Sequence, residues 1–267
     1  MSPWIAIVTL WCVLAAAFAM VWAVRRRSAP IDTGASTAFI GGAMGLLLSL
    51  VLFFAMGHWS DASSAAQREA SVTLQLSSSM ALLPERLSNP LQHDVVCVMK
   101  SVVDDEWPTM ATGDRNGDPI TQARIGRLYE RLRDLRATGA NAVPDYQVEQ
   151  VQTLMLDRAG ARDERLSAGL PQVAMPIWAV IFVGVFVLVI LIGVEEKLRG
   201  RTAWIGVGAA LAVVLTMLIG VTAVLDNPYG ALVQVEPSAM QNSIDVILSG
   251  QPANSPVIGP CPPVGRA

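Results

Sequence analysis

Long uncharged apolar blocks dominate the pattern of hydrophobic and polar positions along the chain. Asp, Glu, Lys, Arg and His are absent from residues 4–24, 37–57, 175–194 and 202–225. Each block is close to the ~20 residues that an α-helix needs to cross about 30 Å of hydrocarbon. A helix satisfies its backbone N–H and C=O groups within the segment, as lipid requires. The sequence therefore predicts four transmembrane helices.

Between the second and third blocks, charges of both signs return and apolar residues recur at helical spacing. Asn89-Pro90 has the form of an N-cap followed by proline at the first helical position, which predicts a helix from there to about Trp107. The same period predicts helices over about 125–139 and 144–167. Residues 60–83 contain no helix breaker, so the second span is expected to continue beyond the bilayer. The segment is predicted to be a small helical bundle.

The chain is thus predicted to be an all-α membrane protein. Its segments are residues 1–57 with spans 4–24 and 37–57, a helical insert over 58–174, residues 175–225 with spans 175–194 and 202–225, and a tail over 226–267. The tail after Gly250 is rich in proline and is expected to be extended or partly disordered.

Basic residues beside the spans predict the orientation. Arg25, Arg26 and Arg27 follow the first span, and the short loop 195–201 holds three more basic residues. Positively charged short loops lie in the cytoplasm, so the N-terminus, the insert and the C-terminus are expected on the extracytoplasmic side of the cell inner membrane. The inverted topology, with a cytoplasmic insert, is the alternative.

Composition excludes several classes of protein. The 267 residues are 52% hydrophobic and 15% charged, which does not fit a single soluble domain. The 19 Lys and Arg do not exceed the 22 Asp and Glu, so nucleic-acid binding is not expected.

The common enzyme signatures are absent from the sequence, including GxSxG, HExxH, CxxC and the phosphate-binding glycine loops. The two histidines show no metal-ligand spacing. Asp114, Asn116 and Asp118 resemble the start of a calcium loop, but Pro119 and Ile125 stand where glycine and glutamate are required. We therefore expect no enzymatic activity, cofactor or metal, and a solvated turn at 114–118.

Two groups of charged residues are candidate sites. Asp104, Asp105 and Glu106 stand beside Trp107 at a predicted helix end, where they form either a cation or partner site or a solvated last turn with a packed tryptophan. Arg158, Arg162 and Arg165 share one helix face. They form either an anion-attracting vestibule or a solvated, salt-bridged surface.

The spans carry small residues in place of charges. A proton-coupled carrier normally needs an ionisable group within the membrane, so this class is disfavoured. Gly41 and Gly45 form a small-xxx-small pattern that favours close helix packing, either within the chain or between subunits. A conduction path would be lined by backbone and by Ser49, Thr216 and Thr222.

Three cysteines divide by position. Cys12 lies within the first span and is expected to be an inert apolar residue. Cys97 and Cys261 both face an oxidising compartment in the predicted orientation, so we predict that they form a disulfide.

Several short motifs together resemble those of the bacterial bestrophin-like membrane family. The motifs are Glu106-Trp107-Pro108, Arg165-Leu166, Gly169-Leu170-Pro171 leading to Trp178, and the closing Leu225-Asp226-Asn227-Pro228-Tyr229-Gly230 with Val233, Val235 and Pro237. The resemblance covers roughly residues 1–250. It implies a four-span protein related to bestrophins, which are pentameric anion channels. Tyr229 replaces the more usual phenylalanine, and the predicted outside insert differs from bestrophins, whose bulk is cytoplasmic.

Two functions are compatible with these features. One is an oligomeric bestrophin-like membrane protein that acts as an anion channel, with the three arginines at its outer mouth. The other is a non-catalytic accessory or assembly subunit of a respiratory or envelope complex. The expected partners are membrane lipid and either further copies of the chain or the subunits of a hetero-complex.

Overall fold

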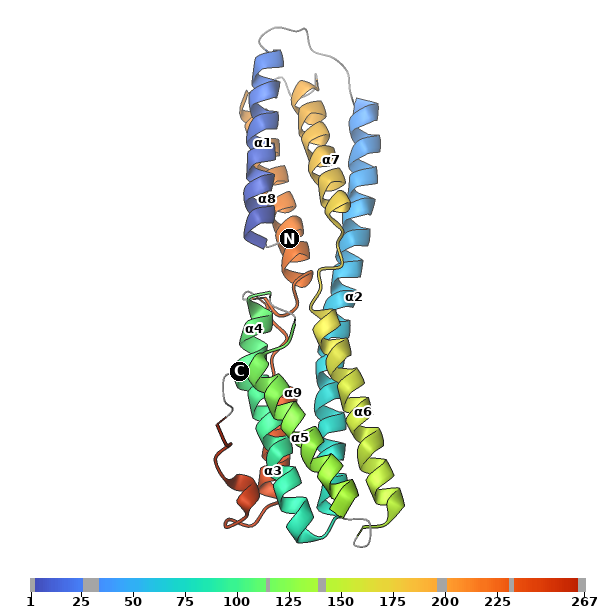
Figure 1. Ribbon diagram of the computed structural model, residues 1–267. Coiled ribbons are helices and arrows are strands. Elements are labelled where there is room, and N and C mark those ends of the chain that lie inside the picture. Colours follow the sequence, from blue (N-terminus) through green and yellow to red (C-terminus); the bar gives the residue numbers. More distant parts are fainter. Residues whose placement is uncertain are drawn as a thin grey trace. The chain divides into compact units, whose positions relative to one another are not determined.

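The computed structural model describes residues 3–25, 34–113, 116–138, 143–195, 201–230 and 233–263. Its regular secondary structure in these ranges is helical, which confirms the all-α prediction (Figure 1). The chain divides into two compact units. The membrane unit comprises Met1–Trp59 and Pro171–Asn227, and the bundle unit comprises Ser60–Leu170 and Pro228–Ala267.

Four helices in the described part of the chain are long and apolar enough to cross a membrane. They are α1 (Pro3–Arg25), α2 (Gly34–Ala81), α7 (Met175–Val194) and α8 (Arg201–Leu225). The 48 residues of α2 far exceed the ~20 needed for one span. Because no proline interrupts it, α2 continues from an apolar half in the membrane unit into a polar half in the bundle unit, as the sequence predicts.

The core of the membrane unit lies where α1, α7 and α8 pack together (Figure 1). Its largest fully buried side chains include Trp178, Leu10 and Ile219. A Cβ atom added to Gly41 would lie 3.6 Å from Leu188 of α7, so this glycine packs within the chain. Gly45 has nothing within 4 Å at the same position and faces open space.

The bundle unit is built around α3 (Glu85–Ser101), against which α5 (Pro119–Thr138), α9 (Ser238–Ser249) and the 3₁₀ turn η3 (Pro256–Ile258) pack. The chain continues from α3 through the π-helix η1 (Val102–Glu106) into α4 (Trp107–Ala111), and α6 (Asp145–Ala168) completes the unit.

The start of α3 differs from the prediction. The helix begins at Glu85, Pro84 occupies the N-cap position, and Pro90 lies inside the helix. The expected cap at Asn89 is therefore wrong. The helix extends toward its N-terminus because Ser88 and Leu91 are already buried, and this packing outweighs the hydrogen bond that Pro90 cannot donate.

The tail beyond α9 has little regular structure, but it lies against the bundle as far as Pro263. Val257 of η3 is fully buried. Arg124 and Arg127 donate to the carbonyl oxygens of Pro262 and Pro263, each at 3.4 Å. Residues 251–263 thus lie against the bundle unit, and apart from η3 they have no regular secondary structure.

Some predicted features lie outside the described residues. The two basic loops that predict the orientation fall largely at 26–33 and 196–200, and Asp114 of the calcium-like turn falls at 114–115.

Candidate functional site

Two carboxylates lie completely buried inside the bundle unit. Glu69 belongs to α2 and Glu106 is the last residue of η1, and each has a relative exposure of 0%. The π-turn explains the position of Glu106. It contains one residue more than an α-turn, so it rotates the following residues by about 100° about the helix axis. Glu106 and Trp107 consequently face the interior, whereas Asp104 is exposed.

Arg165 of α6 joins the two carboxylates. Its Nε donates to Oε2 of Glu69 and its Nη2 to Oε2 of Glu106, both at 2.5 Å. Its Nη1 donates to Sδ of Met110. The guanidinium carbon lies 4.9 Å from the centroid of the Trp107 ring, in cation–π distance.

Arg162 and Arg158, one and two turns earlier on α6, complete the ion cluster, which we define as Glu69, Glu106, Arg158, Arg162 and Arg165. Arg162 binds Glu106 through both Nε, at 3.4 Å, and Nη2. Arg158 donates from Nη2 to Glu69 at 3.5 Å, while its Nε has no hydrogen-bond partner in the described part of the chain. Three guanidiniums thus face two carboxylates.

Burial and charge act against each other on these pKa values. Burial raises the pKa of Glu106, but the guanidiniums of Arg165 and Arg162 outweigh it and hold this pKa below its ordinary value. Burial lowers the pKa of Arg165, but the opposite charges of Glu69 and Glu106 outweigh burial, so this pKa is raised above its ordinary value. The pKa of Arg158 is lowered, because burial exceeds the attraction of Glu69. Glu106 and Arg165 are therefore a charged pair at neutral pH.

An aromatic pair covers the cluster. The rings of Trp107 and Tyr229 meet edge to face, with centroids 5.5 Å apart. Trp107 Nε1 donates to the carbonyl oxygen of Val235 at 2.8 Å, and the Tyr229 hydroxyl donates to that of Ala62 at 3.3 Å. Burial raises the pKa of Tyr229, so its hydroxyl stays protonated. Motifs that are far apart in the sequence thus meet at one place.

The structure brings some predicted site residues together and separates others. Arg158, Arg162 and Arg165 share a face, but this face points into the bundle and pairs with glutamates, so it does not form an open vestibule within the described part of this chain. Of the acidic residues, Glu106 is buried, Asp105 is partly buried and Asp104 is exposed, and the adjacent Trp107 is buried.

Sequence reasoning missed Glu69. The available signal was its place on a face of small residues, where Ala62, Ala66 and Ala70 are also buried. A glutamate on such a face must find a cationic partner when it is buried.

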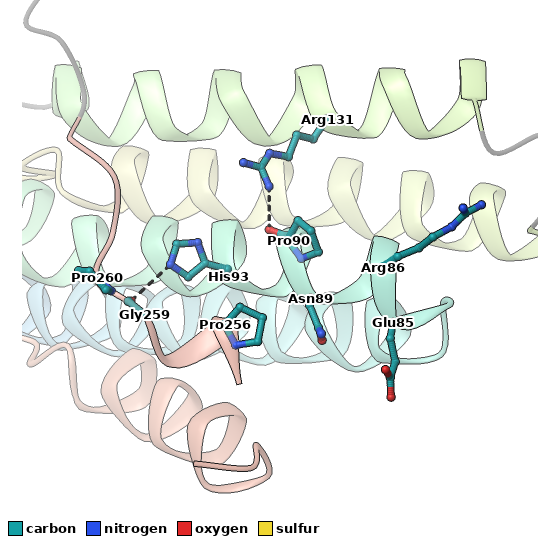
Figure 2. Close-up of a pocket in the computed structure, with 9 residues that line it drawn as sticks. All are labelled: Glu85, Arg86, Asn89, Pro90, His93, Arg131, Pro256, Gly259 and Pro260. Atoms are coloured by element: carbon teal, nitrogen blue, oxygen red, sulfur yellow. Dashed lines mark hydrogen bonds between the residues drawn. The ribbon is translucent and has the colours of Figure 1, made fainter. Parts of the chain in front are cut away.

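A shallow groove of about 690 Å³ is lined by residues of α3, α5 and the tail. Figure 2 shows His93, Pro256, Gly259 and Pro260 along it, with Arg131 opposite. His93 Nε2 lies 3.3 Å from the carbonyl oxygen of Gly259, so the groove borders the tail.

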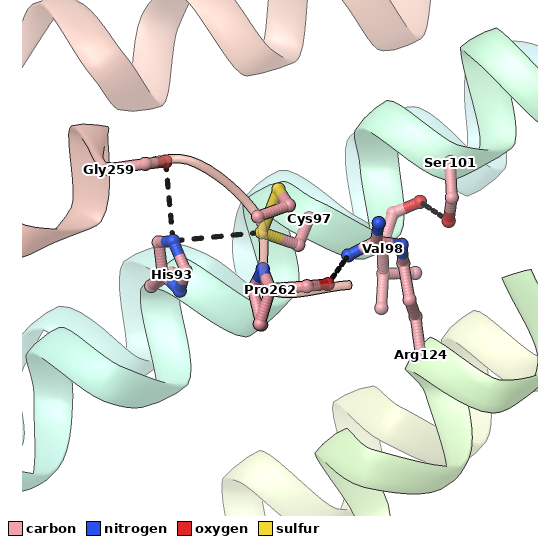
Figure 3. The surroundings of a disulfide bond; sticks show 8 residues. His93, Cys97, Val98, Ser101, Arg124, Gly259 and Pro262 are labelled. Carbon is pink, nitrogen blue, oxygen red and sulfur yellow. Dashed lines mark hydrogen bonds between the residues drawn. A yellow bond between two sulfur atoms is a disulfide. The ribbon is translucent and has the colours of Figure 1, made fainter. Parts of the chain in front are cut away.

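Cys97 of α3 and Cys261 of the tail form a disulfide beside this groove, with Cα atoms 5.5 Å apart (Figure 3). Cys12 is a free cysteine in α1.

The model of the bestrophin-like domain matches residues 5–240, well over half of the sequence. This chain belongs to the bestrophin-like family. The match confirms the resemblance seen in the motifs, and it includes the whole ion cluster and Tyr229. Cys261 and η3 lie beyond it.

Solved structures show the same fold. Two variant structures of a bacterial bestrophin homologue from Klebsiella pneumoniae are each 13% identical to this chain, with TM-scores of 0.68 and 0.69. The matches cover 92% and 94% of this chain and 98% and 100% of those chains. A structure described only as a membrane protein is 11% identical with a TM-score of 0.66, and the match covers 92% of this chain and 97% of that one. A search of curated proteins gave no match.

Proposed function

We propose that this bestrophin-like protein is a subunit of an oligomeric anion channel in the cell inner membrane. The observation that carries the proposal is the family match over residues 5–240, which spans both the membrane unit and the bundle unit. Bestrophins give the family its name and conduct anions. The charge-free spans support passive conduction, because a proton relay would need ionisable groups within the membrane.

The apolar half of α2 is the proposed lining of the path. Phe39, Leu46, Leu50 and Phe53 recur on one helix face and are all exposed, so this stripe is bare in a single protomer. Aromatic rings carry a partial positive charge at their edges, which favours passing anions. Ser49, Thr216 and Thr222 are weaker candidates, because each hydroxyl already donates to a carbonyl of its own helix.

The ion cluster has a supporting role in this proposal. It joins α2 and α6. The N-terminal half of α2 is itself a predicted span, and α6 is followed along the chain by the span α7. We propose that the cluster holds α2, η1 and α6 together within the bundle unit, and that this unit lies on the extracytoplasmic side, as the basic residues after the first span favour.

Reconstitution tests the proposal. The full chain in liposomes is expected to release chloride faster than empty vesicles, and Phe53→Ala is expected to alter the permeability ratio of chloride to larger anions. Val213→Ala, exposed on α8, is the matched control and should leave the ratio unchanged. Chloride release equal to that of empty vesicles would reject the channel.

The accessory-subunit alternative is compatible with the same charge-free spans, which hold no ionisable group for proton coupling. The mass of the native particle separates the two functions. A particle built only of this chain supports the channel, whereas a defined hetero-complex supports the accessory subunit.

A further inference from the structure

Three side chains with metal-binding atoms gather at the junction of α3 and the tail. His93, Cys97 and Cys261 each offer one ligand atom, and these atoms lie within 4.8 Å of one another. His93 and Cys97 are four residues apart on α3 and therefore share a face. Figure 3 shows both pointing toward the tail segment that carries Cys261.

One pair of these atoms, on His93 and Cys97, already has the spacing of a metal site, whereas the two sulfur atoms are bonded to each other. His93 Nε2 lies 3.7 Å from Cys97 Sγ. In tetrahedral zinc sites, metal–nitrogen bonds of ~2.0 Å and metal–sulfur bonds of ~2.3 Å place the two ligand atoms about 3.5 Å apart. The Cα atoms of the cysteines, 5.5 Å apart, are positioned so that rotation of the side chains can separate the sulfur atoms once their bond is broken.

The surroundings supply access and a further ligand. The groove in Figure 2 reaches His93 and Gly259, so an ion and a water molecule can approach from solvent. The carbonyl oxygen of Gly259 already lies 3.3 Å from the imidazole. An oxygen from water or from this carbonyl would complete four-coordination, as in zinc sites that keep one open position.

We propose that His93, Cys97 and Cys261 bind one thiophilic divalent cation, such as Zn²⁺, when the chain is reduced, and that the same cysteines form the disulfide when it is oxidised. A phosphine or dithiol reductant supplies two electrons, the sulfur–sulfur bond breaks, and each sulfur takes up a proton. The cation then displaces both protons and binds two thiolates and the neutral imidazole.

Either linkage attaches the tail to α3. The site lies in the bundle unit and shares no residue with the ion cluster, so its test is independent of channel function. The sequence alone did not show it, because neither the spacing of His93 and Cys97 nor the distant Cys261 matches a common zinc motif.

Metal titration of the full chain in detergent tests the proposal. The protein is reduced with a phosphine, freed of it, and titrated with Zn²⁺ against a chromogenic chelator. Co²⁺ is titrated in parallel, because cobalt–thiolate bonds give charge-transfer absorption. The variants Cys261→Ser and His93→Ala each lack one proposed ligand, and Cys12→Ser is the control that lacks a thiol outside the site. In an oxidised sample of the wild type, the disulfide leaves neither Cys97 nor Cys261 as a free thiol.

The expected result is one Zn²⁺ per reduced chain, with cobalt–thiolate absorption, and no comparable uptake by the oxidised chain. His93→Ala should weaken binding by at least about tenfold, since even changes to groups that support a ligating histidine cost that much. Disulfide formation by oxidised His93→Ala, seen as a loss of two protons in intact mass, shows that this variant folds. Absence of uptake by the reduced chain, or equal uptake by wild type and His93→Ala, would overturn the proposal.

Discussion

Arg165 and Glu106 form a completely buried ion pair, with Nη2 of the arginine 2.5 Å from Oε2 of the glutamate. The π-turn directs Glu106 into the bundle unit, where Arg165 of α6 contacts it. Taking two charges out of water is costly, and the cost is offset only when both groups keep their partners. The pair therefore makes the fold of the bundle unit sensitive to single substitutions.

Glu106→Gln is predicted to destabilise the protein by about 3–5 kcal/mol, because it leaves the buried Arg165 and the partly buried Arg162 without the Glu106 carboxylate, with Glu69 as the remaining counter-charge. Thermal unfolding of the full chain in detergent measures the effect. Asp104→Asn, two residues earlier but exposed, is the matched control and should change stability by less than about 0.5 kcal/mol. Similar losses for both variants would show that Glu106 is not specially constrained.

Stability is predicted to fall in acid through the same residue. The pKa of Glu106 in the folded chain lies below its ordinary value of 4.5, so the unfolded chain binds more protons in this range. The stabilisation is present above pH 4.5 and is lost as the pH falls through the folded pKa. Burial raises the pKa values of Asp94 and Asp105, which act in the opposite sense.

Comparison of the wild type with Glu106→Gln isolates this contribution, because Asp94 and Asp105 are common to both. The difference in unfolding temperature between the two proteins should shrink as the pH is lowered below 4.5. A difference that stays constant with pH would contradict the assignment.

The helices followed from the sequence because their signals are local. The helix α7 has the limits of the predicted third block, Met175–Val194, because a proline at the second residue and a long uncharged apolar run favour one continuous helix. The single long α2 followed equally from the absence of breakers. At α3 the local signal failed, because a typical capping pair at Asn89-Pro90 was overridden by the packing of Ser88 and Leu91.

The ion cluster could not be derived in the same way. Helical period placed Arg158, Arg162 and Arg165 on one face, but it could not distinguish an inward face from a solvated one. Their counter-charge depends on Glu69, distant in sequence, and on the π-turn at Glu106, which no pattern of residue types announces. The site therefore depends on the pairing of arginines with the distant Glu69 and on the extra residue of the π-turn, which turns Glu106 inward.

A side chain at Gly117 is predicted to disturb the ion pair between Arg162 and Glu106. Its φ of +77° favours glycine, and an added Cβ would lie 2.5 Å from Nη2 of Arg162 and 3.1 Å from Oε1 of Glu106. Gly117→Ala should cost about 1–3 kcal/mol in backbone strain and more because Arg162 must move away from Glu106. Gly113, with φ +92° and nothing within 4 Å, is the control for strain alone.

Thermal unfolding of the two alanine variants distinguishes these contributions. Gly117→Ala is expected to be less stable than Gly113→Ala, and the gap should narrow when Glu106→Gln is present in both, since Arg162 is then held less firmly. An equal effect at both glycines would mean that Arg162 moves aside at no cost.

Removal of the disulfide is predicted to loosen the tail while leaving the spans folded. Cys97 and Cys261 close a loop across 164 residues, and loss of such a link typically costs about 2–5 kcal/mol. Cys261→Ser should therefore unfold at a lower temperature and be cut by proteases after α9, where Val257 and the arginine contacts to Pro262 and Pro263 would be released. Cys12→Ser, outside the pair, should behave as the wild type.

Intact mass with and without reductant provides the direct check, because the bond removes two protons. If the non-reduced wild type shows no such deficit, the tail is not held by this bond, and unchanged protease resistance of Cys261→Ser would then be the consistent result.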